Sequence, residues 1–139
     1  MLVLDNSVSM SWCFEDQRTD YTTTVLKALL DGCAVVPSLW FLEVANVATL
    51  AEQKGVLKVL DRVRFIKLLG DLRKHVDHPT GERIWGEVYE LSLKHKLTSY
   101  DARYLELAKR MNLPLASQDG DLKAAAKKEG VALFEVKRR

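Results

Sequence analysis

Three short and uniformly apolar runs set the strongest limit on what this chain can fold into. The runs are Leu2–Leu4, Ala34–Val36 and Val131–Phe134. Each is too short to be a helix, and none alternates apolar with polar residues, so all three are typical of strands covered on both faces. A fourth run, over residues 113–116, is a weaker strand candidate because it contains a proline, which cannot donate to a sheet ladder.

Helical patterns fill the spaces between these runs. Apolar side chains recur at helical spacing, with boundary signals such as Ser38 before one pattern and Gly55 after it. We predict helices over residues 38–54, 56–74, 80–94, 98–111 and 119–129. Strands that alternate with helices predict a layered α/β fold with a mainly parallel sheet. The helix over 56–74 is apolar nearly all round, which favours a second buried face such as a subunit interface.

The size and composition of the chain are those of one ordinary globular domain. With 139 residues, of which 47% are hydrophobic and 29% charged, we expect a single domain over residues 1–139. The formal net charge of +2 allows a polyanionic partner but does not by itself indicate one. Cys13 and Cys33 lack the spacing of a metal-binding pair, and we interpret them as small buried apolar residues.

The N-terminal segment lacks the features of a targeting signal. It has no basic stretch, and Asp5 places a charge too early for the apolar part of a signal peptide. No apolar run approaches the roughly 20 residues that a membrane helix needs. We therefore expect a cytoplasmic protein with no membrane partner.

Two acidic residues follow predicted strands. Asp5 comes directly after the first strand, and Asp119 comes after the run over 113–116. In an open parallel α/β sheet, functional groups gather outside the carboxyl ends of the strands. We therefore expect both carboxylates at the same edge of the sheet.

Two further acids lie on the inner sides of predicted helices. Glu43 has mostly apolar neighbours one turn away, and Asp101 shares a side of its helix with Tyr104 and Leu105. A buried carboxylate is costly unless a cation or hydrogen-bond donors compensate it. Hard oxygen ligands of this kind suit Mg²⁺ or Mn²⁺ rather than a soft metal.

Structural roles also fit three of these acids. Asp119 is a suitable N-cap for the last helix, and Asp5 could cap a turn after its strand. Asp101 follows Thr98 by three residues, as in a capping box. Glu43 lies inside a helix, where no capping role exists. Convergence of all four carboxylates would therefore favour a functional site.

Taken in order, four segments resemble the motifs of PIN-domain ribonucleases. The segments are Val3–Ser7 with Ser11-Trp12, Pro37–Asn46, Leu97–Ala108 and Leu113–Leu122. The resemblance covers essentially the whole chain and is strongest to VapC-type toxins of prokaryotic toxin–antitoxin pairs. It implies a three-layer α/β fold, with a mainly parallel central sheet flanked by helices.

The resemblance also implies a site and an activity. The catalytic residues would be Asp5, Glu43, Asp101 and Asp119. The first, third and fourth of these would contact Mg²⁺ or Mn²⁺ most directly, and Glu43 would bind a second ion or act as a general base. Ser7 and Ser117 would supply hydroxyl groups that orient a ligand or water. The expected activity is endoribonuclease cleavage by metal-assisted hydrolysis of phosphodiester bonds.

The resemblance further implies three partners. They are an RNA substrate, a second copy of the chain in a homodimer, and a cognate VapB-like antitoxin whose tail places a basic side chain in the acidic groove. For RNA phosphates, the candidate contacts are Arg103, Lys123 and the segment Lys137-Arg138-Arg139.

Other functions are less well supported by the residues. Ser7 stands where a phosphoaspartyl phosphatase needs a second Asp, and a zinc site is suggested only by His75 and His78, without a nearby cysteine pair. The main alternative is an RNA- or protein-binding module that keeps the fold without cleaving RNA.

Overall fold

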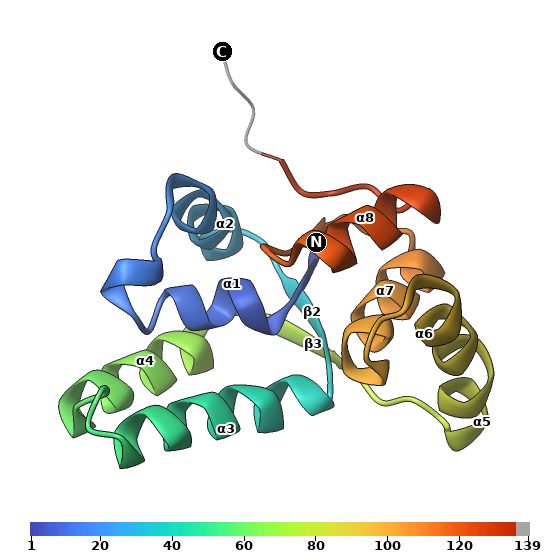
Figure 1. Ribbon diagram of the computed structural model, residues 1–139. Coiled ribbons are helices and arrows are strands. Elements are labelled where there is room, and N and C mark those ends of the chain that lie inside the picture. Colours follow the sequence, from blue (N-terminus) through green and yellow to red (C-terminus); the bar gives the residue numbers. More distant parts are fainter. Residues whose placement is uncertain (136–139) are drawn as a thin grey trace.

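A four-stranded parallel sheet lies between two layers of helices in the computed structural model, which describes residues 1–135 (Figure 1). The strands are β1 (Leu2–Leu4), β2 (Ala34–Pro37), β3 (Lys74–Asp77) and β4 (Leu115–Ala116). Their order in the sheet is β3-β2-β1-β4, and every neighbouring pair is parallel. The fold is therefore the three-layer α/β arrangement that the sequence predicts.

The centre of the sheet is the most deeply buried part of the molecule. Val3 is opposite Val35 of β2 and Leu115 of β4, and all three side chains are inaccessible to solvent. The predicted strand over 131–134 is reduced to one bridge, in which Leu133 pairs with Leu115. That part of the prediction is wrong in extent, although the run does extend the sheet beyond β4.

The helices form one layer on each face of the sheet, as Figure 1 shows to the left and right of the strands. One layer contains α1 (Asn6–Ser11), the short 3-10 helix η1 (Glu15–Gln17), α2 (Asp20–Leu30), α3 (Leu39–Gln53) and α4 (Val59–Asp71). The other contains α5 (Gly81–Arg83), the π-helical η2 (Ile84–Val88), α6 (Tyr89–His95) and α7 (Ser99–Met111). The last helix, α8 (Gly120–Lys128), packs against α7. No helix within residues 1–135 has both the length and the apolar character needed to cross a membrane.

The helices α1 and α2 are not among those predicted from sequence. The first half of α2 is mainly Asp and Thr, which have low helix propensity. A capping box compensates, since the Thr19 hydroxyl accepts from the Thr22 amide at 3.1 Å and the Thr19 amide donates to the Thr22 hydroxyl at 3.0 Å. Burial of Val25 and Leu29 then fixes α2 on the core.

The polar strand β3 is also missed, because the predicted helix over 56–74 overruns it. The helix α4 ends at Asp71, and β3 begins three residues later at the edge of the sheet, paired only with β2. The Lys74 ammonium donates to the Leu69 and Leu72 carbonyls at 2.7 Å each. These bonds satisfy carbonyls that the end of α4 leaves free.

A single carboxylate, Glu129, connects the last three helices. It accepts hydrogen bonds from Lys94 at 2.8 Å and Lys109 at 3.0 Å, and its Oε2 lies 2.7 Å from His95 Nε2. The side chain of Glu129 is only 6% exposed. Hydrogen bonds from Lys94, His95 and Lys109 lower the pKa of Glu129 to about 2.

This network predicts a pH-dependent contribution to stability. Because the folded-state pKa of Glu129 lies below its unfolded value, the carboxylate stabilises the fold above about pH 4.5, and this is lost as the pH falls through 2. Glu129→Gln should lower the free energy of unfolding by about 1 kcal/mol at pH 7, since its lysine partners are partly exposed. Urea denaturation measures this, with the exposed Glu90→Gln as control. Equal losses for both variants at pH 7 would contradict the prediction.

Candidate active site

The first acid of the site, Asp5, lies where β1 ends and α1 begins. Its Oδ1 accepts hydrogen bonds from the Ser7 hydroxyl at 2.7 Å and the Val8 amide at 3.1 Å. Asp5 is thus the N-cap of α1, as one of the structural roles considered for it predicts. Its residue surface is only 4% exposed. The Asp5 carboxylate therefore caps the helix and is buried at the same time.

The second acid, Asp119, stands in the same relation to β4 and α8. Its Oδ1 accepts from the Leu122 amide at 2.8 Å, which makes it the N-cap of α8. The Gln118 amide donates to the Ser7 hydroxyl at 3.0 Å and so connects the segments after β4 and β1. Because β1 and β4 are parallel neighbours, Asp5 and Asp119 lie at the same carboxyl edge of the sheet, as predicted.

Glu43 and Asp101 approach this edge from α3 and α7. The Tyr104 hydroxyl donates to Glu43 Oε1 at 2.6 Å, so α7 holds the carboxylate that α3 carries. Asp101 lies one turn before Tyr104 on α7. Its amide donates to the Thr98 hydroxyl at 3.1 Å, which confirms Thr98 as the helix cap.

Burial, with smaller effects of neighbouring acid charges, raises the pKa of three of the four carboxyl groups. Burial raises the pKa of Asp5 to about 6, against hydrogen bonds from Ser117, Ser7 and Val8, with a further increase from the Asp101 charge. Burial also raises the pKa of Glu43, and the charges of Asp101 and Asp5 add to this. Burial and the charge of Asp119 raise the pKa of Asp101. The charges of the four predicted acids therefore act on one another at this edge of the sheet.

The chemistry of these groups fits a divalent cation. None of the four acids forms an ion pair with Lys, Arg or His within residues 1–135. Beside Asp5, the Oδ1 atom of Asn6 is buried without a hydrogen-bond partner in the described chain. Carboxylate and amide oxygens are the donors that Mg²⁺ and Mn²⁺ prefer. In the part of the chain that the structure describes, no three Asp, Glu, His or Cys side chains form a group that could hold a metal ion.

One predicted RNA contact is wrong. Arg103 is 1% exposed, and its guanidinium donates to Glu106 Oε2 at 2.8 Å and to Asp77 Oδ2 at 2.6 Å. It is therefore part of the internal packing of α7 and not available to a phosphate. Lys123 is half-buried on α8, and the segment Lys137-Arg138-Arg139 lies outside the described residues.

Sequence reasoning missed two residues that position the acids. Tyr104 was noticed only as an apolar neighbour of Asp101, although its hydroxyl binds Glu43. Gln118 carries no sequence signal beyond its place next to Asp119. Its side-chain amide lies 3.5 Å from the Ser7 carbonyl, and its backbone amide binds the Ser7 hydroxyl.

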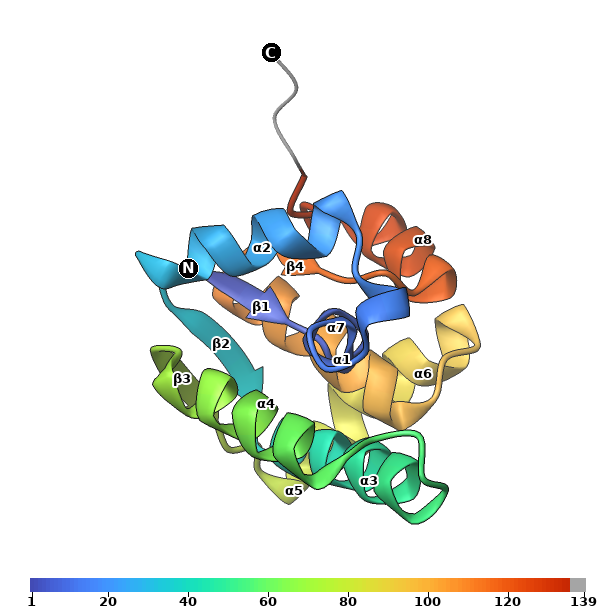
Figure 2. The same cartoon turned by 90° about the vertical axis from the view of Figure 1, so that its left-hand side faces the viewer.

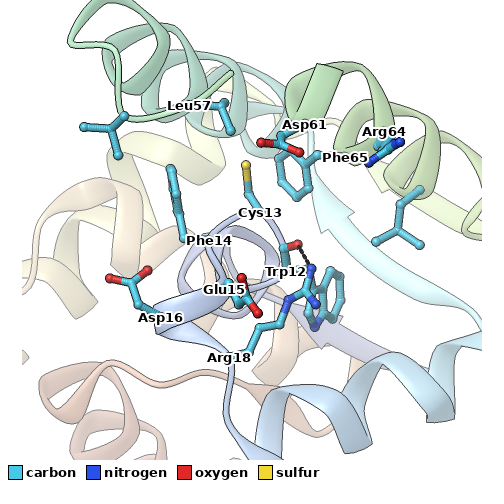
Figure 3. Close-up of a pocket in the computed structure, with 12 residues that line it drawn as sticks. Trp12, Cys13, Phe14, Glu15, Asp16, Arg18, Leu57, Asp61, Arg64 and Phe65 are labelled. Atoms are coloured by element: carbon cyan, nitrogen blue, oxygen red, sulfur yellow. Dashed lines mark hydrogen bonds between the residues drawn. The ribbon is translucent and has the colours of Figure 1, made fainter. Parts of the chain in front are cut away.

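A separate cavity of about 800 Å³ lies between the end of α1, η1 and α4, and none of the four acids lines it (Figure 3). The Trp12 carbonyl on its wall accepts a hydrogen bond from Arg18 at 3.1 Å. Burial, together with the Asp61 charge, raises the pKa of the Cys13 thiol there to about 11. A thiol of this kind stays protonated at neutral pH and is a poor nucleophile.

The raised pKa of Asp5 predicts that the acid cluster destabilises the metal-free fold at neutral pH. The group favours folding below about pH 4, and this advantage is lost as the pH rises through 6. Asp5→Asn keeps the acceptor oxygen and removes the charge, so it should raise the free energy of unfolding at pH 8 by up to about 3 kcal/mol. At pH 4 the variant and the wild type should be equally stable.

Thermal unfolding in EDTA at pH 4 and pH 8 measures this effect. The exposed Asp20→Asn on α2 removes one charge elsewhere and should give no stabilisation at pH 8. A destabilised Asp5→Asn protein at pH 8 would contradict the cost assigned to the buried charge.

Comparison with known proteins places the chain in a family. The model of the PIN domain matches residues 2–128. The solved structure of PAE2754 from Pyrobaculum aerophilum is similar with a TM-score of 0.66 and 22% identity, over 89% of this chain and 78% of that one. FitAcB from Neisseria gonorrhoeae gives a TM-score of 0.63 and 20% identity, over 97% of each chain. At these identities the two structures show a shared fold alone, and no curated protein sequence matches significantly. The family match spans most of the chain, which therefore belongs to the PIN-domain family.

Proposed function

We propose that the protein is a metal-dependent endoribonuclease that hydrolyses RNA phosphodiester bonds at its acidic cluster. PIN domains are in general metal-dependent nucleases. The observation that carries the proposal is that four carboxylates from four separate segments approach one edge of the sheet without an internal ion pair in the described residues. Burial and the charges of neighbouring acids raise the pKa of three of them. They are Asp5, Glu43, Asp101 and Asp119. Repulsion between neighbouring negative carboxylates destabilises the fold, and a bound cation would remove this repulsion.

The proposed ligands of the cation are Asp5, Asp101 and Asp119. A bound Mg²⁺ or Mn²⁺ ion would activate a water molecule for attack and would neutralise the negative charge that develops on the leaving oxygen. Glu43 either contributes to a second ion or takes a proton from the attacking water as a general base. Its hydrogen bond from Tyr104 fixes the carboxylate and favours its charged form.

Two serines support the proposed ligands without being ligands themselves. The Ser7 hydroxyl donates to Asp5 and accepts from the Gln118 amide. It therefore connects the Asp5 carboxylate to the segment that follows β4. The Ser117 hydroxyl accepts from the Asp119 amide at 3.0 Å and lowers the pKa of Asp5. Both hydroxyls lower the pKa of Asp5 and so partly offset the effect of burial.

The sequence motifs support a VapC-type toxin in particular. In that case a cognate VapB-like antitoxin would place a basic side chain against the acidic cluster, where the described residues supply no cation of their own. The protein would therefore be isolated in complex with this partner. Activity has to be measured on toxin freed of antitoxin, and adding the antitoxin back should suppress it.

We also propose that the protein forms a homodimer through α4. In the isolated chain, α4 exposes four apolar side chains, each accessible to 47% or more. They are Val59, Leu60, Val63 and Ile66. Exposed apolar area of this kind on one helix is typical of a protein–protein interface.

The nuclease proposal predicts RNA cleavage that depends on both metal and Asp5. The purified protein should cleave cellular RNA at discrete sites with Mg²⁺ or Mn²⁺ and not with EDTA. Asp5→Asn should reduce the rate by about 100-fold or more, because charge stabilisation by the metal is worth several kcal/mol. Gel analysis of the RNA products measures both effects.

Two results would contradict the nuclease proposal. One is equal cleavage by a folded Asp5→Asn protein, which would remove Asp5 from the active site. The other is RNA binding without cleavage under every metal condition, which would favour a binding module that keeps the fold. Asp20→Asn, with the same charge change on α2, should cleave like the wild type.

The dimer proposal predicts a solution mass of twice the 15.8 kDa of the chain. Replacing Leu60 and Val63 together by Lys should give the single-chain mass in sedimentation equilibrium, because charges would be buried without partners. Leu30→Lys, at an exposed leucine of α2, should leave the dimer intact. A monomeric wild type would contradict the homodimer, and a dimer that survives the double substitution would exclude α4 as its interface.

A further inference from the structure

A second cavity, of about 460 Å³, adjoins the acidic edge of the sheet. Its lining comes from the start of α2, the end of β4, α8 and the segment after α8. Figure 2 shows α2, β4 and α8 in the upper part of the molecule. The volume of the cavity falls in the range of small-molecule sites, roughly 300–1,000 Å³. None of the four acids lines it.

One wall of this cavity is basic. Lys123 and Lys127 both line it, and they lie four residues apart and therefore on the same side of α8. Neither forms an ion pair within residues 1–135. Glu135 is the acidic residue among those that line the cavity, so the lining carries a net positive charge.

Another part of the lining is aromatic. The rings of Tyr21 and Phe134 have centroids 6.4 Å apart and are inclined at 59°. The Tyr21 hydroxyl donates to the Phe134 carbonyl at 2.8 Å, which fixes the two residues relative to each other. Both side chains are half-buried and so present ring surface without large freedom of movement.

The cavity is directly connected to the acid cluster through the segment after β4. Ser117 and Gln118 line it, and the next residue is Asp119. The Gln118 amide also binds the Ser7 hydroxyl that donates to Asp5. Part of the cavity lining is therefore continuous in the chain with the residue that carries the Asp119 carboxylate.

We propose that this cavity binds one nucleotide of a single-stranded RNA, next to the bond that is cut. The backbone phosphate would lie on Lys123 and Lys127, and the base would contact the Tyr21 and Phe134 rings. The proposal rests on the proposed function, since it requires RNA to be the substrate. Base–aromatic contact requires an unstacked base, which is why a single strand and not a duplex is the ligand.

The charge distribution gives a reason for such a subsite. The acid cluster repels a polyanion when no cation is bound, so the affinity of the metal-free protein for RNA has to come from cationic side chains outside the cluster. Lysines that lie beside the cluster, and that the protein does not pair internally, supply this attraction through phosphate contacts.

Fluorescence anisotropy with a labelled ten-nucleotide single-stranded RNA tests the proposal, in EDTA so that no cleavage occurs. The variant with Lys123→Ala and Lys127→Ala should bind about tenfold more weakly than the wild type. The slope of log Kd against log salt concentration should fall by about one for each lysine. A control with Lys27→Ala and Lys128→Ala removes the same charge from the surfaces of α2 and α8 outside the cavity, and should change Kd less than threefold.

The outcomes separate this proposal from the nuclease proposal. Equal weakening by the two double variants, or equal dependence on Lys123 and Lys127 for a duplex of the same sequence, would overturn the nucleotide site. An absence of RNA binding by the wild type would overturn it as well. Cavity-dependent binding by a protein that never cleaves RNA would support the site and contradict the nuclease.

Discussion

The arrangement of the site depends on the burial of one carboxylate, that of Asp5, at the point where the central strand ends. Removing a carboxylate from water is costly unless donors replace the lost hydration. The Val8 amide and the Ser7 hydroxyl replace part of it, and the same bonds begin α1. The pKa of Asp5 still rises to about 6, so the donors do not fully compensate burial. The Asp5 side chain therefore both caps α1 and contributes a buried carboxylate to the candidate site.

Parallel pairing then determines where the other acids can lie. A cap at the end of β1 and a cap at the end of β4 must be neighbours, because the two strands run in the same direction side by side. Asp119 repeats the role of Asp5 on α8, and the bond from Gln118 to Ser7 holds the two ends together. The capping role of these acids and the metal-binding role proposed for them are thus not alternatives, since the capping bonds of each carboxylate are made to its Oδ1 atom alone.

The sequence predicted the elements whose signal is strong and local. The helices α3, α7 and α8 carry apolar periodicity with recognisable boundaries, and their observed limits agree within about two residues. Strand β3 has the polar sequence Lys74–Asp77, which a periodicity rule cannot separate from the end of the preceding helix. The Thr-rich start of α2 also lacks a local helical signal, because the helix is stabilised by its capping box and by burial of Val25 and Leu29.

The positions of the four acids and the resemblance to PIN-domain motifs indicated the candidate site, whereas pairwise contacts could not be predicted. Arg103 looked like a phosphate ligand because it stands beside Asp101. Its partner Asp77 is 26 residues away in the chain, on a strand that was not predicted. The hydrogen bond from Tyr104 to Glu43 spans 61 residues, and it depends on how α3 and α7 meet across the sheet. Contacts of this range follow from the assembled fold and have no local signal.

The buried acids of this protein are of two kinds, and the difference separates packing from function. Glu106 is inaccessible to solvent, yet it is bonded to Arg83, Arg103 and Arg110 at 2.8–3.1 Å. Such a carboxylate is compensated within the fold and needs nothing from outside. The Asp5 cluster forms no ion pair with a basic side chain of the described residues, although the charges of neighbouring acids raise the pKa of Asp5, Glu43 and Asp101. The fold thus neutralises Glu106 with three arginines and leaves the Asp5 cluster without any, and this contrast supports the proposal that the cluster binds an external cation.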